Sequence, residues 1–499
     1  MAHPPKVRAA RPSAPASVPG TAGQVSGAPG SNGPGSNGPG SFNGPGYAPG
    51  TEPGPGSGSV PGSGPAGVGD AVARLRAAAT TEPGRLRIIG AVLAALVIAF
   101  GAVTAAEVSD RAAAADDVVG RSQPLSADAA QVYRSLADAD TAASSGFLAG
   151  PVKEPRAVRE RYEKDITRAS QLLVKAATHT EAGSASARQI RTLNEQLPLY
   201  TGLIETARAY NRQGKPLGGA YLRFANERMT KVLLPAAQKL YDAETARLDR
   251  DDDDATAWPV FALLAGLVAV GALGWAQRRN YLRTNRVFNQ GLLAATAASV
   301  VLLLWLVAAH AVAASQLGEA RTGGEQSLRA LNEARISSLK ARANENLVLV
   351  ARGAVLTDDG KHDKYETEYD EDMGALVNAL GRAQRLADDD RGGDPLRKAT
   401  ASVGEWRERH EKVGTADRRG DYSRARELVI GRADSTGESF DRVDEALEQA
   451  LEHEQREFTR AAESGRDALG LLPVGAAALG VLGALGAVLG INRRLSEYR

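Results

Sequence analysis

The chain has 499 residues, a formal net charge of +1 and no cysteine. A charge this close to zero gives no overall attraction to nucleic acid, and the lack of cysteine excludes disulfide scaffolds, thiolate metal sites and cysteine nucleophiles. Outside its first 70 residues the chain is rich in Ala, Arg, Glu and Leu and has few aromatic residues. This composition predicts an all-α protein rather than a β-sandwich or a doubly wound sheet.

The N-terminal segment, residues 1–87, differs from the rest in composition. Residues 1–70 hold 18 Gly and 14 Pro, with a repeated Gly-Pro-Gly-Ser-Asn pattern around residues 33–41. Such a segment has too few apolar side chains to bury a core, so we predict a disordered tail. It could act as a tether or as a passive leader.

Four uncharged apolar segments follow, at 88–106, 258–276, 291–314 and 468–491. Each is about as long as the 20 helical residues that cross the hydrocarbon core of a bilayer. If the protein were soluble, these four segments would have to be four buried helices, each apolar on every side. The sequence therefore predicts a membrane protein with four transmembrane helices, the first of them an uncleaved anchor because 87 residues precede it.

The distribution of basic residues predicts the orientation of these spans. The N-terminal tail carries 7 Lys and Arg against 3 acidic residues, and the C-terminal tail, 492–499, carries 3 against 1. The loop at 277–290 contains Arg278, Arg279, Arg283 and Arg286 and no acidic residue. Because basic residues in short flanking segments stay in the cytoplasm, both termini and this loop are predicted to be cytoplasmic and the protein to lie in the cell membrane.

The two long segments between spans, 107–257 and 315–467, are then extracytoplasmic. A shift of 203 residues places the first span on the third and gives nine identities in 42 positions of the following segments. The matches include Ser135/Ser338, Gly150/Gly353 and Tyr162/Tyr365. Farther on, a shift of 206 pairs Gly214 with Gly420. We predict a tandem repeat in which breakers divide each outer segment into four helices that form an up-and-down bundle.

No motif for catalysis, a cofactor or a metal stands out in the sequence. The six histidines form no His-x-x-x-His pair, and neither a Gly-x-Ser-x-Gly nor a phosphate-binding Gly-x-x-x-x-Gly-Lys motif occurs. We therefore expect a protein that is not an enzyme and has no cofactor and no metal site.

Two groups of arginines are candidate interaction sites. Arg208 and Arg212 precede Gly214, where they either close a helix or, with Arg418 and Arg419 of the second segment, form a basic rim for an anionic ligand or a partner. The four arginines of the 277–290 loop either mark the topology or contact a cytoplasmic partner. Glycine-rich faces in spans two and four, including Gly486-x-x-x-Gly490, predict close helix contacts within the chain or between the copies of a homo-oligomer.

Several segments give the chain a resemblance to a known family. YRSLADAD at 133–140, NRQG at 211–214 with YLR at 221–223, and LLPAA at 233–237 resemble the actinobacterial GlnX family, over about residues 85–499. Members of that family are four-span proteins associated with a glutamate- and aspartate-binding lipoprotein outside and the soluble Ser/Thr kinase PknG inside. The resemblance implies a membrane relay that passes amino-acid availability from the lipoprotein to the kinase.

Two other functions fit the same sequence. A receptor could bind a small ligand directly, which requires a polar pocket of ligand size between bundle helices. A structural or envelope-assembly protein of the membrane requires neither such a pocket nor the two partners. In all three cases membrane lipid surrounds the spans and nucleic acid is not a partner.

Overall fold

The computed structural model describes residues 82–150, 154–284, 289–387, 389–431 and 433–495, which all belong to one compact unit spanning 67–499. Every secondary-structure element in these ranges is helical apart from one isolated bridge between Leu356 and Asp363. The predicted all-α fold is confirmed. The Gly/Pro-rich part of the predicted tail lies outside the described residues.

The helices follow one another in two similar series. The first series contains α2 (Glu82–Asp117), α3 (Gln123–Leu148), α4 (Arg156–His179), α5 (Ala185–Arg212), α6 (Leu217–Arg228), α7 (Leu234–Thr256) and α8 (Val260–Thr284). The second contains α9 (Gln290–Glu319), α10 (Gln326–Ala351), α11 (Lys364–Leu386), α12 (Asp390–Arg418), α13 (Tyr422–Ile430), α14 (Thr436–Gly470) and α15 (Leu472–Leu495).

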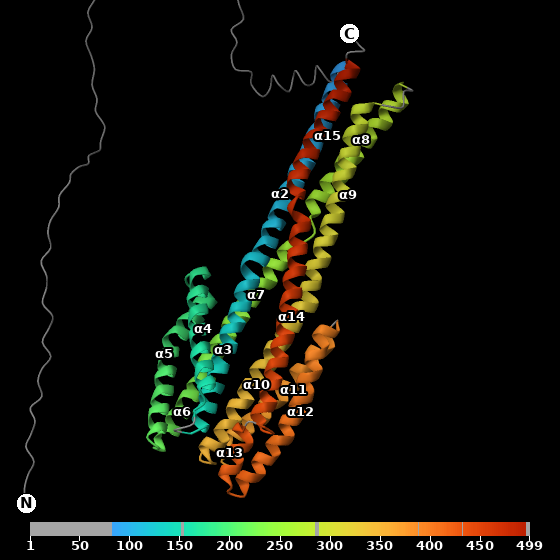
Figure 1. Ribbon diagram of the computed structural model, residues 1–499. Helices are drawn as coiled ribbons and strands as arrows, with labels where there is room; N and C mark the ends of the chain where they lie inside the picture. Colours follow the sequence, from blue (N-terminus) through green and yellow to red (C-terminus); the bar gives the residue numbers. More distant parts are fainter. Residues whose placement is uncertain (1–81, 151–153, 285–288, 388, 432, 496–499) are drawn as a thin grey trace, which may run out of the picture. The chain divides into compact units, whose positions relative to one another are not determined.

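Four of these helices are long and apolar enough to cross a membrane, as a multi-pass membrane protein requires. The four predicted spans largely coincide with α2, α8, α9 and α15, which run side by side at one end of Figure 1. Span two begins two residues before α8, and span four begins in the last turn of α14. The two described tryptophans of span two, Trp258 and Trp275, stand at its two ends and are half exposed, as interfacial aromatic residues are.

Glycines allow the closest contacts between these helices. The Cα atoms of Gly101 in α2 and Gly480 in α15 face each other, and Gly291 of α9 lies against the backbone of Gly486 and Gly490 in α15. The predicted small-residue face of span four is therefore a packing surface. In span two only Gly266 has close neighbours, Phe100 and Leu303, whereas Gly271 and Gly274 face open space.

The helices that leave the membrane segments are continuous with them. A single run of helix, which passes through a π-helical turn at Val118–Ser122, extends over Gly84–Leu148 and joins span one to α3. A second run, with a π-helical turn at Ala320–Glu325, covers Gln290–Ala351 and joins span three to α10. At the α7–α8 break, Arg111 of α2 donates to the carbonyls of Ala257 and Trp258.

Away from the spans, α3 to α7 and α10 to α14 form two groups of antiparallel helices, as predicted, but the groups share a core. One cluster of buried side chains includes Leu136 and Leu173 of the first group together with Leu339 and Trp406 of the second. The parallel helices α3 and α10 pack against each other at the centre. Their faces carry Ala and Ser, which let the backbones approach closely enough for Thr141 Oγ1 to donate to the Leu339 carbonyl over 2.7 Å.

Candidate functional site

The predicted basic rim does not form one surface. Arg208 is buried, stacks over the Tyr162 ring and pairs with Glu154 and Glu205 at 3.2 and 2.7 Å. Arg212, Arg418 and Arg419 are exposed at the ends of their helices. Contact of these three arginines with a partner stays a prediction, while Arg208 belongs to the interior of the first group.

The alternative interpretation of these segments, that they end helices, is confirmed. Gly214 has φ +67° and Gly420 has φ +76°. At the first site the amide of Lys215 donates to the Tyr210 carbonyl, and at the second the amide of Asp421 donates to the Ala416 carbonyl, each over 3.0 Å. Both are Schellman motifs, in which glycine takes the left-handed conformation that ends a helix.

The arginines between spans two and three lie largely on a helix rather than in a loop. Helix α8 continues to Thr284, so Arg278, Arg279 and Arg283 are helical. Arg278 is exposed, and the Arg279 guanidinium stacks over Trp275 at 5.2 Å. Arg286 lies outside the described residues. The helix continues because Ala276 to Tyr281 contains no Gly or Pro to end it.

A cleft with a volume of about 970 Å³ lies between the two helical groups. It is lined by α3, α4, α10, α13 and α14. Its charged residues have both signs: Asp138, Glu154, Arg161, Arg342, Arg426, Glu427, Glu438 and Asp441. Small-molecule sites have volumes of roughly 300–1,000 Å³, so the cleft is large enough for a ligand.

An ionic bridge connects the two groups at this cleft. Arg161 of α4 contacts Asp138 of α3 at 2.7 Å and Asp444 of α14 at 2.9 Å. Asp444 also accepts a hydrogen bond from Arg335 of α10 over 2.9 Å. Burial, and then the carboxylate of Asp138, raise the pKa of Asp165 to about 8. Arg161 thus links helices of both groups through the carboxylates of Asp138 and Asp444. Neighbouring carboxylates raise each other's pKa, so the protonation of this site depends on how close the carboxylates lie.

The second group contains a buried polar network around Glu345, whose side chain is fully buried. Its carboxylate accepts hydrogen bonds from Arg342, Thr436 and Trp406 and faces Nδ1 of His410 at 2.9 Å. His410 Nε2 lies 3.2 Å from Glu366. Although burial opposes it, hydrogen bonding to these two carboxylates raises the pKa of His410 to about 9, so the imidazole is charged at neutral pH.

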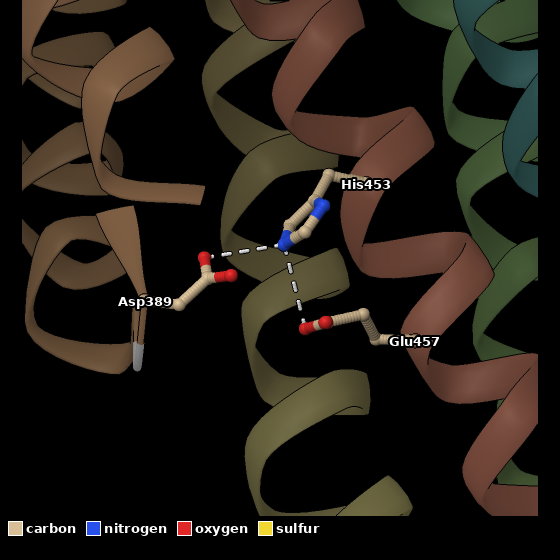
Figure 2. Close-up of side chains that lie close together, drawn as sticks. All are labelled: Asp389, His453 and Glu457. Atoms are coloured by element: carbon tan, nitrogen blue, oxygen red, sulfur yellow. Dashed lines mark ion pairs between the residues drawn. The ribbon is translucent and has the colours of Figure 1, made fainter. Parts of the chain in front are cut away.

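A third cluster lies where the start of α12 meets α14 (Figure 2). Nε2 of His453 is 3.2 Å from Asp389 Oδ1 and 3.5 Å from Glu457 Oε2. Figure 2 shows one nitrogen of the His453 imidazole pointing toward both carboxylates, one from each element. These three residues form the set of potential metal ligands found among the described residues.

Sequence reasoning missed this cluster because Asp389 is distant from the other two residues along the chain. The available signal was His453 and Glu457, which are four residues apart and therefore share one face of a helix.

Comparisons with known proteins assign one part of the chain. No curated protein and no solved structure matches the chain. Residues 114–253, which contain α3 to α7 except for the last turn of α7, match the family model described as an actinobacterial sensor domain. This match suggests a role in sensing or signalling.

Proposed function

We propose that this protein is a non-enzymatic transmembrane sensor that receives a signal on its extracytoplasmic helices and passes it to a soluble cytoplasmic protein. The observation that carries the proposal is the continuity of the helices. The helix runs Gly84–Leu148 and Gln290–Ala351 each combine a membrane span with one of the two central helices, α3 or α10. A shift between α3 and α10 would therefore reach the spans without crossing a loop.

The contacts between α3 and α10 suit a small shift. They combine alanine packing with short polar contacts, such as Asn346 Nδ2 to Ser144 Oγ at 3.1 Å. The Arg161 bridge connects the same two helical groups, through α4 and α14, and is accessible from the cleft. A ligand or partner that prefers one arrangement of this interface shifts the population toward it.

For the partners we propose those that the family resemblance implies. A glutamate- and aspartate-binding lipoprotein would deliver the signal outside, and a soluble Ser/Thr kinase would receive it inside. Arg278, Arg279, Arg283 and Arg286 follow span two, and their positive charge suits an acidic surface on the kinase.

Direct binding of a small ligand is the second candidate, and the inter-group cleft favours it. Its volume of about 970 Å³ and its charges of both signs suit a small zwitterion such as an amino acid. Calorimetry separates the two candidates, because a direct receptor binds glutamate or aspartate when purified alone, whereas a relay requires the lipoprotein.

A disulfide lock tests the proposed movement. The chain has no cysteine, so Ser144→Cys with Asn346→Cys introduces a single pair across the α3–α10 interface. With lipoprotein and glutamate present, we expect oxidation to abolish the glutamate-dependent change in kinase co-purification and reduction to restore it.

The control pair, Ser126→Cys with Thr245→Cys, lies within the first group, where the two hydroxyl oxygens are 2.9 Å apart. It should leave the response intact when oxidised. A locked α3–α10 pair that still responds would show that the signal does not pass through this interface.

A further inference from the structure

The cluster of Asp389, His453 and Glu457 has the geometry of a cation site. The ligand atoms of the three residues all lie within 4.8 Å of one another. In a tetrahedral zinc site, bonds of about 2.0–2.1 Å place neighbouring ligand atoms roughly 3.3 Å apart. The separations of His453 Nε2 from the two carboxylate oxygens, 3.2 and 3.5 Å, are close to that value.

His453 supplies a second observation that points to a ligand. Its side chain is only 9% exposed, and its Nε2 atom is buried without a hydrogen-bond partner. A buried polar atom normally has such a partner, so an unpaired one requires an explanation. Nε2 faces the carboxylates of Asp389 and Glu457 at ion-pair distance. A metal ion between the three groups would use the nitrogen lone pair and both carboxylates.

Asp389 is held in place by the local structure. It is the N-cap residue of α12, and its Oδ1 accepts the amide hydrogen of Gly392 over 2.7 Å. The carboxylate therefore needs little rearrangement to serve as a ligand.

The donor set indicates the class of metal. One imidazole nitrogen and two carboxylate oxygens match Zn²⁺, with a water molecule in the fourth position. Ca²⁺ takes six to eight oxygen ligands and Mg²⁺ prefers an octahedral oxygen shell, so neither suits a site that contains an imidazole. We propose that Asp389, His453 and Glu457 bind one Zn²⁺ ion, which joins the beginning of α12 to α14.

The first group has a different pair at the related positions. Residues 206 earlier than His453 and Glu457 are Arg247 and Asp251, which form a salt bridge at 3.9 Å. An arginine there would repel a cation, so the stoichiometry is one metal ion per chain.

A metal at this position would act close to the membrane segments. Phe458, next to Glu457, contacts Gly324 in the π-helical turn that follows span three. Phe458 also belongs to a buried cluster with Val118, Leu248 and Leu317. Zn²⁺ would thus stiffen α14 at the point where it meets the helices that enter the spans.

The test uses the full-length protein, purified in detergent, freed of any histidine tag and treated with a chelator. We expect titration with Zn²⁺ against a chromophoric competitor to give one site per chain. Co²⁺ should bind at the same site and give the visible absorption of a tetrahedral complex. His453→Gln and Glu457→Gln should each weaken Zn²⁺ binding by at least about tenfold. Even substitutions of residues that only hydrogen-bond to a metal ligand lower metal affinity by that factor.

The matched control is His179→Gln, which alters an exposed histidine at the end of α4 and should keep the wild-type affinity. Thermal unfolding without metal checks that each variant is folded. Glu457→Gln keeps the shape of the side chain if His453→Gln does not fold. The proposal is overturned if the wild type binds no Zn²⁺, if it prefers Ca²⁺ or Mg²⁺, or if the folded ligand variants bind as tightly as His179→Gln.

Discussion

Single residues show how differently the two helical groups use buried charge. In the first group, Asp140 of α3 is buried and accepts hydrogen bonds from Tyr200 and Asn226. In the second group, Glu345 of α10 is surrounded by the cations Arg342 and His410. Burial therefore raises the pKa of Asp140 to about 6, whereas the pKa of Glu345 is lowered because its cationic partners outweigh burial.

The pKa of His410, about 9, predicts how stability depends on pH. Because this value lies above that of an unfolded histidine, about 6.5, the stabilisation is complete below pH 6.5 and is lost as pH rises through 9. The His410 ring lies within hydrogen-bond distance of Glu345 and Glu366 and stacks on Tyr369. Arg342 and Trp406 donate to Glu345 rather than to the ring. We expect the wild-type unfolding temperature to fall between pH 7 and pH 9.5.

His410→Gln should be less stable at pH 7 and should show a smaller fall over the same range, measured by circular dichroism. His179→Gln, on an exposed surface, should follow the wild-type curve. Equal pH dependence in wild type and His410→Gln would contradict a charged histidine in this network.

At the scale of helices, glycines bring the backbones of α9 and α15 into close contact. A Cβ added to Gly291 would lie 2.3 Å from the Gly486 carbonyl oxygen and 2.5 Å from the Gly490 Cα. Backbone atoms cannot move away as a flexible side chain can, so α9 and α15 would have to separate. Gly271 offers a contrast, because nothing lies within 4 Å of a Cβ there.

Gly291→Ala should therefore destabilise the protein, by roughly 1–3 kcal/mol as for other overpacked sites. Gly271→Ala should have no effect or a small stabilising one, because alanine favours the helix by up to about 1 kcal/mol. Thermal unfolding in detergent measures both variants. If the two variants behave alike, the close contact between α9 and α15 is not present in the protein.

For the whole molecule, the arrangement of charges predicts which face of the membrane each segment occupies. Cysteines placed singly at Glu181 and Ala401, both exposed, should react with an impermeant maleimide in intact cells. A cysteine at Asn285, outside the described residues, should react only after permeabilisation, because basic segments remain inside. Labelling at Asn285 alone in intact cells would reverse the predicted orientation.

The sequence alone determined the helical class, the four membrane-spanning candidates and the glycines that end α5 and α12. These properties are local, since they depend on runs of apolar residues and on backbone dihedral preferences. The tandem repeat stays a prediction from the sequence pattern.

Only the tertiary structure decided which surfaces face each other. It merged the two predicted bundles into one core along α3 and α10, buried Arg208 among carboxylates and brought Asp389 to His453. Helical periodicity reveals that a face is buried but not which helix covers it, and the Ala-rich faces of this chain fit several neighbours. Contacts between residues far apart in the chain depend on that choice, so no local pattern could have predicted the cleft or the proposed metal site.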